Sequence, residues 1–166
     1  MVNPLLPSEF WGISIGVYLF LGGLAGGAYV SGAAADLLST RHPDREDSYF
    51  QTARWSMVIA VLSISVGGLL LLFHLGEPLN VLKFWLFTNL QSWMTIGIWV
   101  IILFTGLAAL QALWLGFGRE NGFPVSIGPI DKLAMVTRPS ESIRRAITAF
   151  GIVVGVLLAV YTALLL

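Results

Sequence analysis

The sequence predicts an all-α integral membrane protein built as a bundle of four transmembrane helices. Of its 166 residues, 57% are apolar and only 11% are charged, whereas soluble domains average about 45–50% apolar and about 25% charged residues. Four apolar stretches also reach the roughly 20 residues that a spanning helix needs. We therefore expect a single transmembrane domain over residues 1–166, with spans at about 11–37, 55–75, 92–116 and 146–166.

Basic residues alternate along the chain, and this alternation predicts the orientation. The residues before the first span contain no Lys or Arg. The link 38–54 contains three, the link 76–91 contains only Lys83, and the link 117–145 contains five. Because Lys and Arg collect in cytoplasmic loops, we expect an outside N-terminus and cytoplasmic first and third links.

Small residues recur every fourth position in the first and last spans. In the first span they are Gly23, Gly27, Ser31 and Ala35, widened by Gly22 and Gly26. The last span repeats the spacing with Gly151, Gly155, Ala159 and Ala163. Such faces let helix backbones approach closely in lipid. We expect them to pack helix against helix, or for some glycines to make room for a flat ring against the backbone.

Polar and aromatic groups from all four spans meet at one predicted level, the outer leaflet. Tyr18 lies in the first span, His74 ends the second and Tyr161 lies near the end of the fourth. Asn89, Gln91 and Trp93 open the third. Each tyrosine alone fits an ordinary interfacial aromatic, and His74 alone fits a helix end. Together, phenol and imidazole donors in an apolar pocket suit a lipid-soluble quinone, whose carbonyl oxygens need hydrogen-bond donors.

The stretch after the second span carries groups that suit proton transfer. His74 can exchange protons near neutral pH, and Glu77 can pass them to water. The alternative is a helix that ends at water, with Glu77 and Lys83 as a solvated pair. At the opposite face, Asp36 ends the first span and Arg54 opens the second. A structural ion pair between them is one interpretation, and a proton-entry role for Asp36 is the other.

Several cofactors and ligands are not expected in this chain. With no cysteine among the 166 residues, thiolate-held iron–sulfur clusters and thiolate zinc sites are excluded here. The two histidines, His42 and His74, lie at opposite faces and cannot ligate one haem iron. Net charge is zero, so nothing points to nucleic acid. We expect no haem and no metal, and electrons that leave a quinol must therefore pass to a cofactor on a partner.

Two segments carry a family resemblance. FWGISIGVYLFLGGLAGGAYVSG (10–32) and HLGEPLNVLKFWLFTNLQSWMTIG (74–97) resemble the NrfD/polysulfide reductase membrane-subunit family. The shared pattern is a first helix with a GGLAGG-like core, then HLG-x-P, FW, N and SWM around the second external link. The ending AVYTALLL also resembles the family's fourth helix. Members typically have eight or more helices, so the resemblance implies the N-terminal four-helix portion of a longer subunit.

The resemblance implies a multi-pass subunit of the prokaryotic inner membrane that binds menaquinone or ubiquinone without haem. It implies electron exchange with a four-cluster, ferredoxin-like iron–sulfur subunit at the outer face, and often then with a molybdopterin catalytic subunit. Tyr161 matches a quinone-contacting tyrosine of the family's fourth helix. The family's first-helix contacts include a histidine and an asparagine, and this sequence departs from them with Tyr18 and Ile15.

The leading hypothesis is a quinone-binding membrane anchor of a respiratory oxidoreductase, with terminal catalysis on partner subunits. The proposed quinone contacts are Tyr18, His74 and Tyr161, and the proposed proton-transfer groups are His74, Glu77 and Asp36. The residues expected to dock the iron–sulfur partner are Lys83, Trp85, Asn89, Gln91 and Trp93. The alternatives are a purely structural anchor and half of a secondary transporter. The transporter fits less well, because broken helices and midplane charges are not evident.

Overall fold

A computed structural model describes residues 8–74, 93–117, 122–124 and 127–164. Four long helices dominate: α1 (Ser8–Ser39), α2 (Glu46–His74), α4 (Trp93–Gly116) and α6 (Glu141–Leu164). A 3-10 turn, η1 (Pro43–Arg45), precedes α2, and a short helix, α5 (Gly128–Thr137), lies between α4 and α6. Each long helix contains a stretch long and apolar enough to cross a membrane. The predicted all-α, four-span fold class is confirmed.

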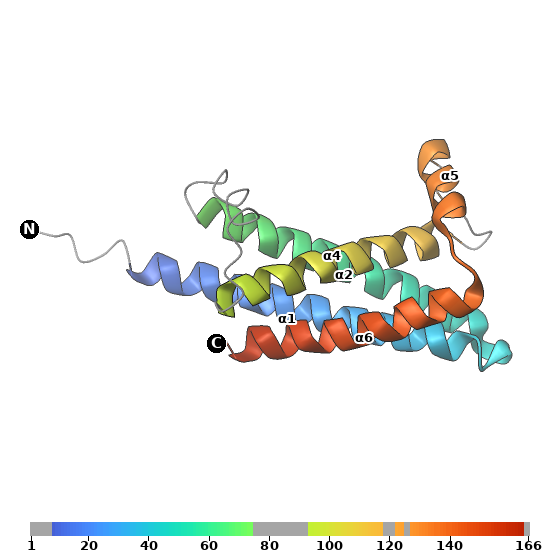
Figure 1. The fold of residues 1–166 in the computed structure, drawn as a ribbon, viewed down its shortest axis with the longest axis horizontal. Coiled ribbons are helices and arrows are strands. Elements are labelled where there is room, and N and C mark those ends of the chain that lie inside the picture. The colour runs from blue at the N-terminus through green and yellow to red at the C-terminus, as the bar shows by residue number, and fades with distance from the viewer. Residues whose placement is uncertain (1–7, 75–92, 118–121, 125–126, 165–166) are drawn as a thin grey trace, which may run out of the picture.

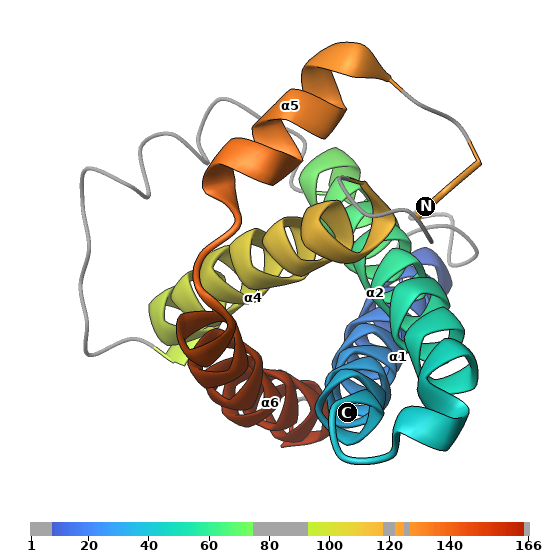
Figure 2. The ribbon, with the colours of Figure 1, turned by 90° about the vertical axis from the view of Figure 1, so that its right-hand side faces the viewer.

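The four long helices form a ring. In Figure 1 they run alongside one another, and the start of α1 lies at the same end of the bundle as the end of α6. Viewed along the helices, in Figure 2, they follow one another around the ring as α1, α2, α4 and α6. The turn between α1 and α2 and the whole of α5 lie at the other end. Consecutive long helices are therefore neighbours in space.

Two helices begin earlier than the apolar pattern indicates. α2 starts at Glu46 rather than near residue 55, and α6 starts at Glu141 rather than near 146. Both have acidic residues in the first turn, where the positive end of the helix dipole stabilises negative charge. Because hydropathy alone excludes such charged turns, Arg54 and Arg144 were assigned to links although they lie within helices.

Each long helix contributes a large side chain to the centre of the bundle. Tyr29 of α1, Met57 of α2, Phe104 of α4 and Leu158 of α6 are fully buried. The rings of Tyr29 and Phe104 meet across the bundle, with centroids 5.3 Å apart at 59°. The outward faces are also apolar, with exposed Phe20, Leu62, Leu103 and Val153. An apolar exterior around a packed core is what a bundle surrounded by lipid requires.

The close contact between α1 and α6 uses Gly22 and Gly26, the glycines that widen the expected ladder, rather than the ladder that begins at Gly23. Gly22 and Gly26 are buried, whereas Gly27 and Ser31 face outward. A Cβ at Gly26 would lie 2.6 Å from the Gly155 carbonyl oxygen, and one at Gly27 would meet nothing within 4 Å. The four-residue spacing in the sequence was right, but the contact face is shifted by one residue. In this region of α1 small residues cover both faces, so spacing alone could not select one.

Candidate functional site

Tyr18 and Tyr161 lie at the same end of the bundle, one on α1 and one on α6. Both side chains are partly buried, and their helices pack against each other. Neither hydroxyl has a hydrogen-bond partner among the residues the structure describes. Two phenol donors thus remain available at one level of the bundle.

Glycines on the neighbouring helices face these tyrosines. A Cβ at Gly67 of α2 would lie 3.8 Å from the Tyr18 ring, and one at Gly97 of α4 would collide with the Tyr161 hydroxyl. The Tyr161 ring therefore lies against the α4 backbone because position 97 has no side chain. Gly97 is not among the glycines for which we expected a ring against the backbone. Among those, Gly151 of α6 lies against the Tyr29 ring in the same way. With Gly67 and Gly97, all four helices contribute to this level, which we call the tyrosine end.

The remaining residues expected at this level are only partly described. His74 is the last residue of α2 and Trp93 is the first of α4, which places their backbones near the tyrosine end (Figure 1). Their side chains are outside the described part of the structure. Outside the described residues altogether are Glu77, Lys83, Trp85, Asn89 and Gln91. Their roles stay predictions.

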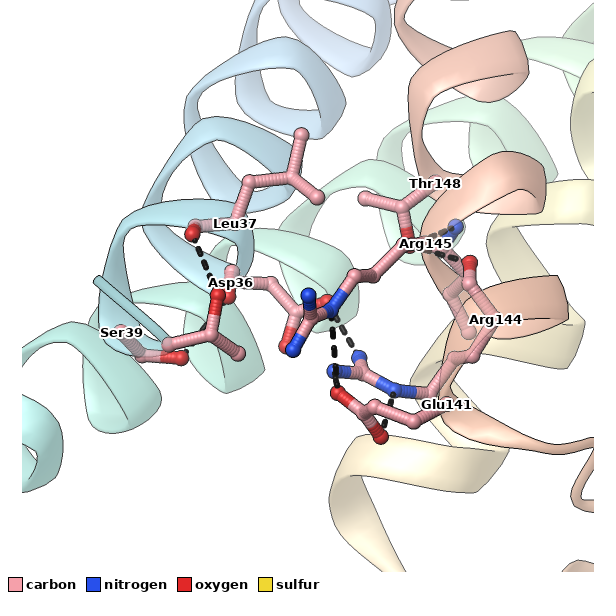
Figure 3. A network of polar contacts seen from close by, with 9 residues as sticks. Asp36, Leu37, Ser39, Glu141, Arg144, Arg145 and Thr148 are labelled. Atoms are coloured by element: carbon pink, nitrogen blue, oxygen red, sulfur yellow. Dashed lines mark hydrogen bonds and ion pairs between the residues drawn. The ribbon is translucent and has the colours of Figure 1, made fainter.

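A buried ion network occupies the opposite end of the bundle, which we call the arginine end. The Arg144 Nη1 of α6 donates to Asp36 Oδ2 of α1, and both side chains are almost completely buried. On its other side, Arg144 donates from Nη2 to Glu141 Oε1 at 2.7 Å and from Nε to Glu141 Oε2 at 3.3 Å. Figure 3 shows the guanidinium between the two carboxylates. One cation thus joins α1 to the first turn of α6.

The expected pairing of Asp36 with Arg54 is therefore wrong. Arg54 donates from Nη1 to the Gly122 carbonyl oxygen at 2.7 Å, and its guanidinium lies 5.0 Å from the Phe123 ring centroid and 5.7 Å from that of Trp55. Its side chain is thus directed toward the segment after α4. Arg144 becomes available to Asp36 because α6 begins early enough to bring it inside the bundle.

Further polar groups continue the network toward the bundle centre. Thr148, one turn after Arg144, accepts a hydrogen bond from Gln111 Nε2 of α4 at 3.2 Å and donates one to the Arg144 carbonyl oxygen at 3.0 Å. Among the described residues, three buried oxygens lack a hydrogen-bond partner. They are Asp36 Oδ1, Gln111 Oε1 and Tyr29 Oη. These oxygens lie on α1 and α4 and can bond to water.

Two further features of the described residues concern metal ligands and a surface hollow. Within the described ranges, no three His, Asp or Glu side chains group so that they could hold a metal ion. A surface hollow of about 520 Å³ lies along α2, lined by residues from Asp47 to Ile59. It belongs to the part of α2 near the arginine end, so it is separate from Tyr18 and Tyr161.

The geometry defines a class of protein before any comparison: a polytopic all-α membrane protein with unpaired phenols at one end and a buried ion network at the other. The comparisons with known proteins specify the family. Residues 2–166 match the family described as "Polysulphide reductase, NrfD". The chain belongs to this family, as the resemblance indicated, and is a membrane protein.

Two relatives show how much of a family member is present. The chain is similar to the polysulfide reductase C subunit of Wolinella succinogenes, with 31% identity over 94% of this chain and 47% of that protein. It is also similar to protein NrfD of Escherichia coli K12, with 26% identity over 96% of this chain and 49% of that protein. The chain spans about half the length of these curated relatives. No solved structure matches it significantly.

The sequence alone did not indicate the residues that pack or pair with the predicted ones at each end of the bundle. Arg144 and Glu141 were counted as link residues, although a Glu three positions before an Arg is a helix-surface pairing that signals an early helix start. Gly67 and Gly97 carry no chemistry of their own. They become informative only when the tyrosine rings that lie against them are known.

Proposed function

We propose that this chain forms a quinone-binding part of a haem-free membrane anchor subunit of a respiratory oxidoreductase. The subunit exchanges electrons between membrane quinol and an iron–sulfur partner at the outer face. The observation that carries the proposal is the tyrosine end, where Tyr18 of α1 and Tyr161 of α6 lie at the same end of the bundle and neither hydroxyl has a protein partner among the described residues. Membership of the NrfD family supports it.

The chemistry of the two phenols fits a quinone. Each hydroxyl can donate a hydrogen bond to a carbonyl oxygen of the oxidised head group or accept one from a hydroxyl of the reduced form. The surrounding helices expose apolar side chains such as Phe20, which suits a ligand that arrives from lipid. In this proposal Tyr18 and Tyr161 bind and orient the head group, and they are not themselves oxidised.

His74 and Glu77 handle the protons in this scheme. Oxidation of a quinol to a quinone releases two electrons and two protons, and reduction takes up the same numbers. The electrons pass to or from the iron–sulfur partner, so this chain has only to move the protons. His74 ends α2 at the tyrosine end, and Glu77 follows it three residues later in the sequence.

The partner subunit docks over the same end. The docking residues we propose are Lys83, Trp85, Asn89, Gln91 and Trp93, which include the large aromatics that interface cores favour. A partner docked over this end would hold its first iron–sulfur cluster close to the proposed quinone site. A molybdopterin subunit beyond the iron–sulfur subunit would perform the terminal catalysis.

Two roles are available for Asp36 at the arginine end. Its ion pair with Arg144 favours a structural role in which α1 is fixed to α6. Its unpartnered Oδ1, with the unpartnered Tyr29 Oη two helical turns away on the same helix, favours proton entry from the cytoplasmic side as the second candidate.

The experiment that tests the proposal is Tyr161→Phe in the full-length subunit within its complex. Removing the hydroxyl while keeping the ring should lower quinol-linked electron transfer several-fold and leave assembly intact. Tyr49→Phe is the matched control, because Tyr49 lies at the opposite end against the His42 ring, with centroids 6.2 Å apart. Unchanged turnover in Tyr161→Phe would remove this residue from the site.

A second measurement separates quinone binding from a purely structural anchor. Binding of a fluorescent quinone analogue to the purified complex should quench its emission, and a quinone-site inhibitor should reverse the quenching. If neither the wild type nor the Tyr49→Phe control quenches the analogue, the subunit is a structural anchor.

A further inference from the structure

Helix α5 runs across the bundle rather than along it. In Figure 1 it stands out sideways from the arginine end, and in Figure 2, viewed along the four long helices, its axis lies nearly in the plane of the picture. The four long helices cross the membrane, so a helix that runs across them lies parallel to the membrane plane. Its position beside the end of α4 places it at the membrane–water boundary.

One side of α5 faces the protein. Ala134 is buried, Ile130 and Asp131 are half-buried, and these positions share one side of the helix. Thr137, the last residue of α5, accepts a hydrogen bond from Trp114 Nε1 near the end of α4 at 3.2 Å. This bond and the buried Ala134 fix the rotation of α5 about its own axis.

The next side of α5 is apolar and exposed. Pro129, Leu133 and Val136 follow one another at helical spacing, and Leu133 is 53% and Val136 85% exposed. A short helix with such a stripe buries it at an acyl-chain boundary when it lies in the membrane plane. The bundle also has an exposed apolar belt, which includes Val153 of α6.

Positive charge accompanies this stripe. Lys132 of α5 is exposed, and so are Arg41, Arg45 and Arg145 from other segments near the arginine end. Eight of the nine Lys and Arg residues of the sequence lie in residues 41–54 or 119–145, where they outnumber the six Asp and Glu residues of the same ranges. Juxtamembrane basic residues are attracted to the anionic phospholipids of the cytoplasmic leaflet.

We propose that α5 is an interfacial helix seated in the headgroup region of the leaflet at the arginine end. Its ligand is phospholipid: Pro129, Leu133 and Val136 contact the upper acyl chains, and Lys132 contacts headgroup phosphates. The proposal does not depend on quinone binding. It depends on the orientation of α5 across the spans, its exposed apolar stripe and the basic residues beside it.

The test is the depth of spin labels on the full-length protein reconstituted in anionic lipid nanodiscs. Nitroxides are attached to single-cysteine variants Leu133→Cys and Val136→Cys. Val153→Cys on the exposed face of α6 is the bilayer standard, and Asp44→Cys in η1 is the aqueous standard. All four side chains are exposed, so the substitutions leave the buried core intact. Collision rates are measured with oxygen, which partitions into lipid, and with a hydrophilic nickel chelate.

We expect the labels at positions 133 and 136 to show a ratio of oxygen to nickel collisions several-fold above that at position 44. The ratio should lie below that at position 153, because a headgroup-level helix is shallower than the bilayer interior. A ratio equal to the aqueous standard would place the stripe in water and overturn the proposal. Low collision rates with both reagents would show that protein covers the stripe, from another part of the polypeptide or a partner, and would also overturn it.

Discussion

The two ends of this bundle treat polar groups in opposite ways. At the arginine end, the Arg144 guanidinium pairs with the carboxylates of both Asp36 and Glu141. At the tyrosine end, Tyr18 and Tyr161 are neutral and lie against glycine-containing backbone, with no described residue bonded to either hydroxyl. A buried charge without a partner is strongly unfavourable in a low-dielectric interior, whereas a phenol tolerates partial burial. The arginine end therefore pairs its charges within the bundle, whereas the two phenols of the tyrosine end have no partner among the described residues.

The two ends of the bundle should therefore contribute differently, the arginine end to stability and the tyrosine end to function. Changes at the arginine end should act mainly on the free energy of unfolding, because they leave a buried ion without its counterpart. Changes at the tyrosine end should act mainly on turnover, because little of the fold depends on the hydroxyls. Substitutions with matched controls at each end test that separation.

Arg144→Ala should have the largest effect. It leaves Asp36 buried with no cation, and loss of one member of a buried ion pair lowers the free energy of unfolding by about 3–5 kcal/mol. Arg145→Ala is the control, because Arg145 is exposed and lies 3.6 Å from the Glu141 carboxylate, and exposed pairs contribute about 0–1 kcal/mol. The free energies are measured by titration with a denaturing detergent.

The double variant Arg144→Met with Asp36→Leu sharpens this prediction. It replaces both buried ions with apolar side chains of similar size, and such replacement is often neutral or stabilising. We expect it to recover most of the stability lost in Arg144→Ala. Equal losses in Arg144→Ala and Arg145→Ala would mean that the buried pair does not stabilise the bundle.

Gly97→Ala should have the second largest effect on stability and a larger one on turnover. The added Cβ collides with the Tyr161 hydroxyl, so the ring has to move away from α4. Overpacking typically lowers stability by about 1–3 kcal/mol, and the lower end applies because only the far end of one side chain is displaced. Quinol-linked turnover should fall several-fold, because the phenol is displaced from the proposed quinone site.

Gly106→Ala is the control for this substitution. It lies on the same helix, and its added Cβ would meet nothing within 4 Å. Turnover and stability should match the wild type. A Gly97→Ala protein with wild-type turnover would show that the position of Tyr161 against α4 does not matter for electron transfer.

The sequence predicted the features that depend on composition. It did not predict which face of a helix makes a contact or where a helix begins. Four spans and the level of Tyr18 and Tyr161 follow from hydropathy and from the alternating direction of the helices, and the structure has both. The exact face of α1 does not follow, because Gly22, Gly23, Gly26 and Gly27 make two adjacent faces equally small. The partner of Asp36 does not follow either. It depends on whether the polar residues before residue 146 extend α6, and hydropathy does not report that.

Tyr29→Phe should have the smallest effect on stability and turnover. It tests whether the polar network of the arginine end extends to the Tyr29 hydroxyl. Tyr29 is fully buried against Phe104, and its hydroxyl has no hydrogen-bond partner among the described residues. Removing an unsatisfied buried hydroxyl should leave the free energy of unfolding unchanged or raise it slightly, since leaving such a group unbonded costs about 1–3 kcal/mol. Turnover should also remain unchanged, in contrast to Tyr161→Phe, although both substitutions delete one phenol oxygen from the bundle. If Tyr29→Phe instead lowers stability by more than about 1 kcal/mol, the hydroxyl is held by a bound water. Tyr29 would then be the next group after Asp36 on a proton-entry route along α1.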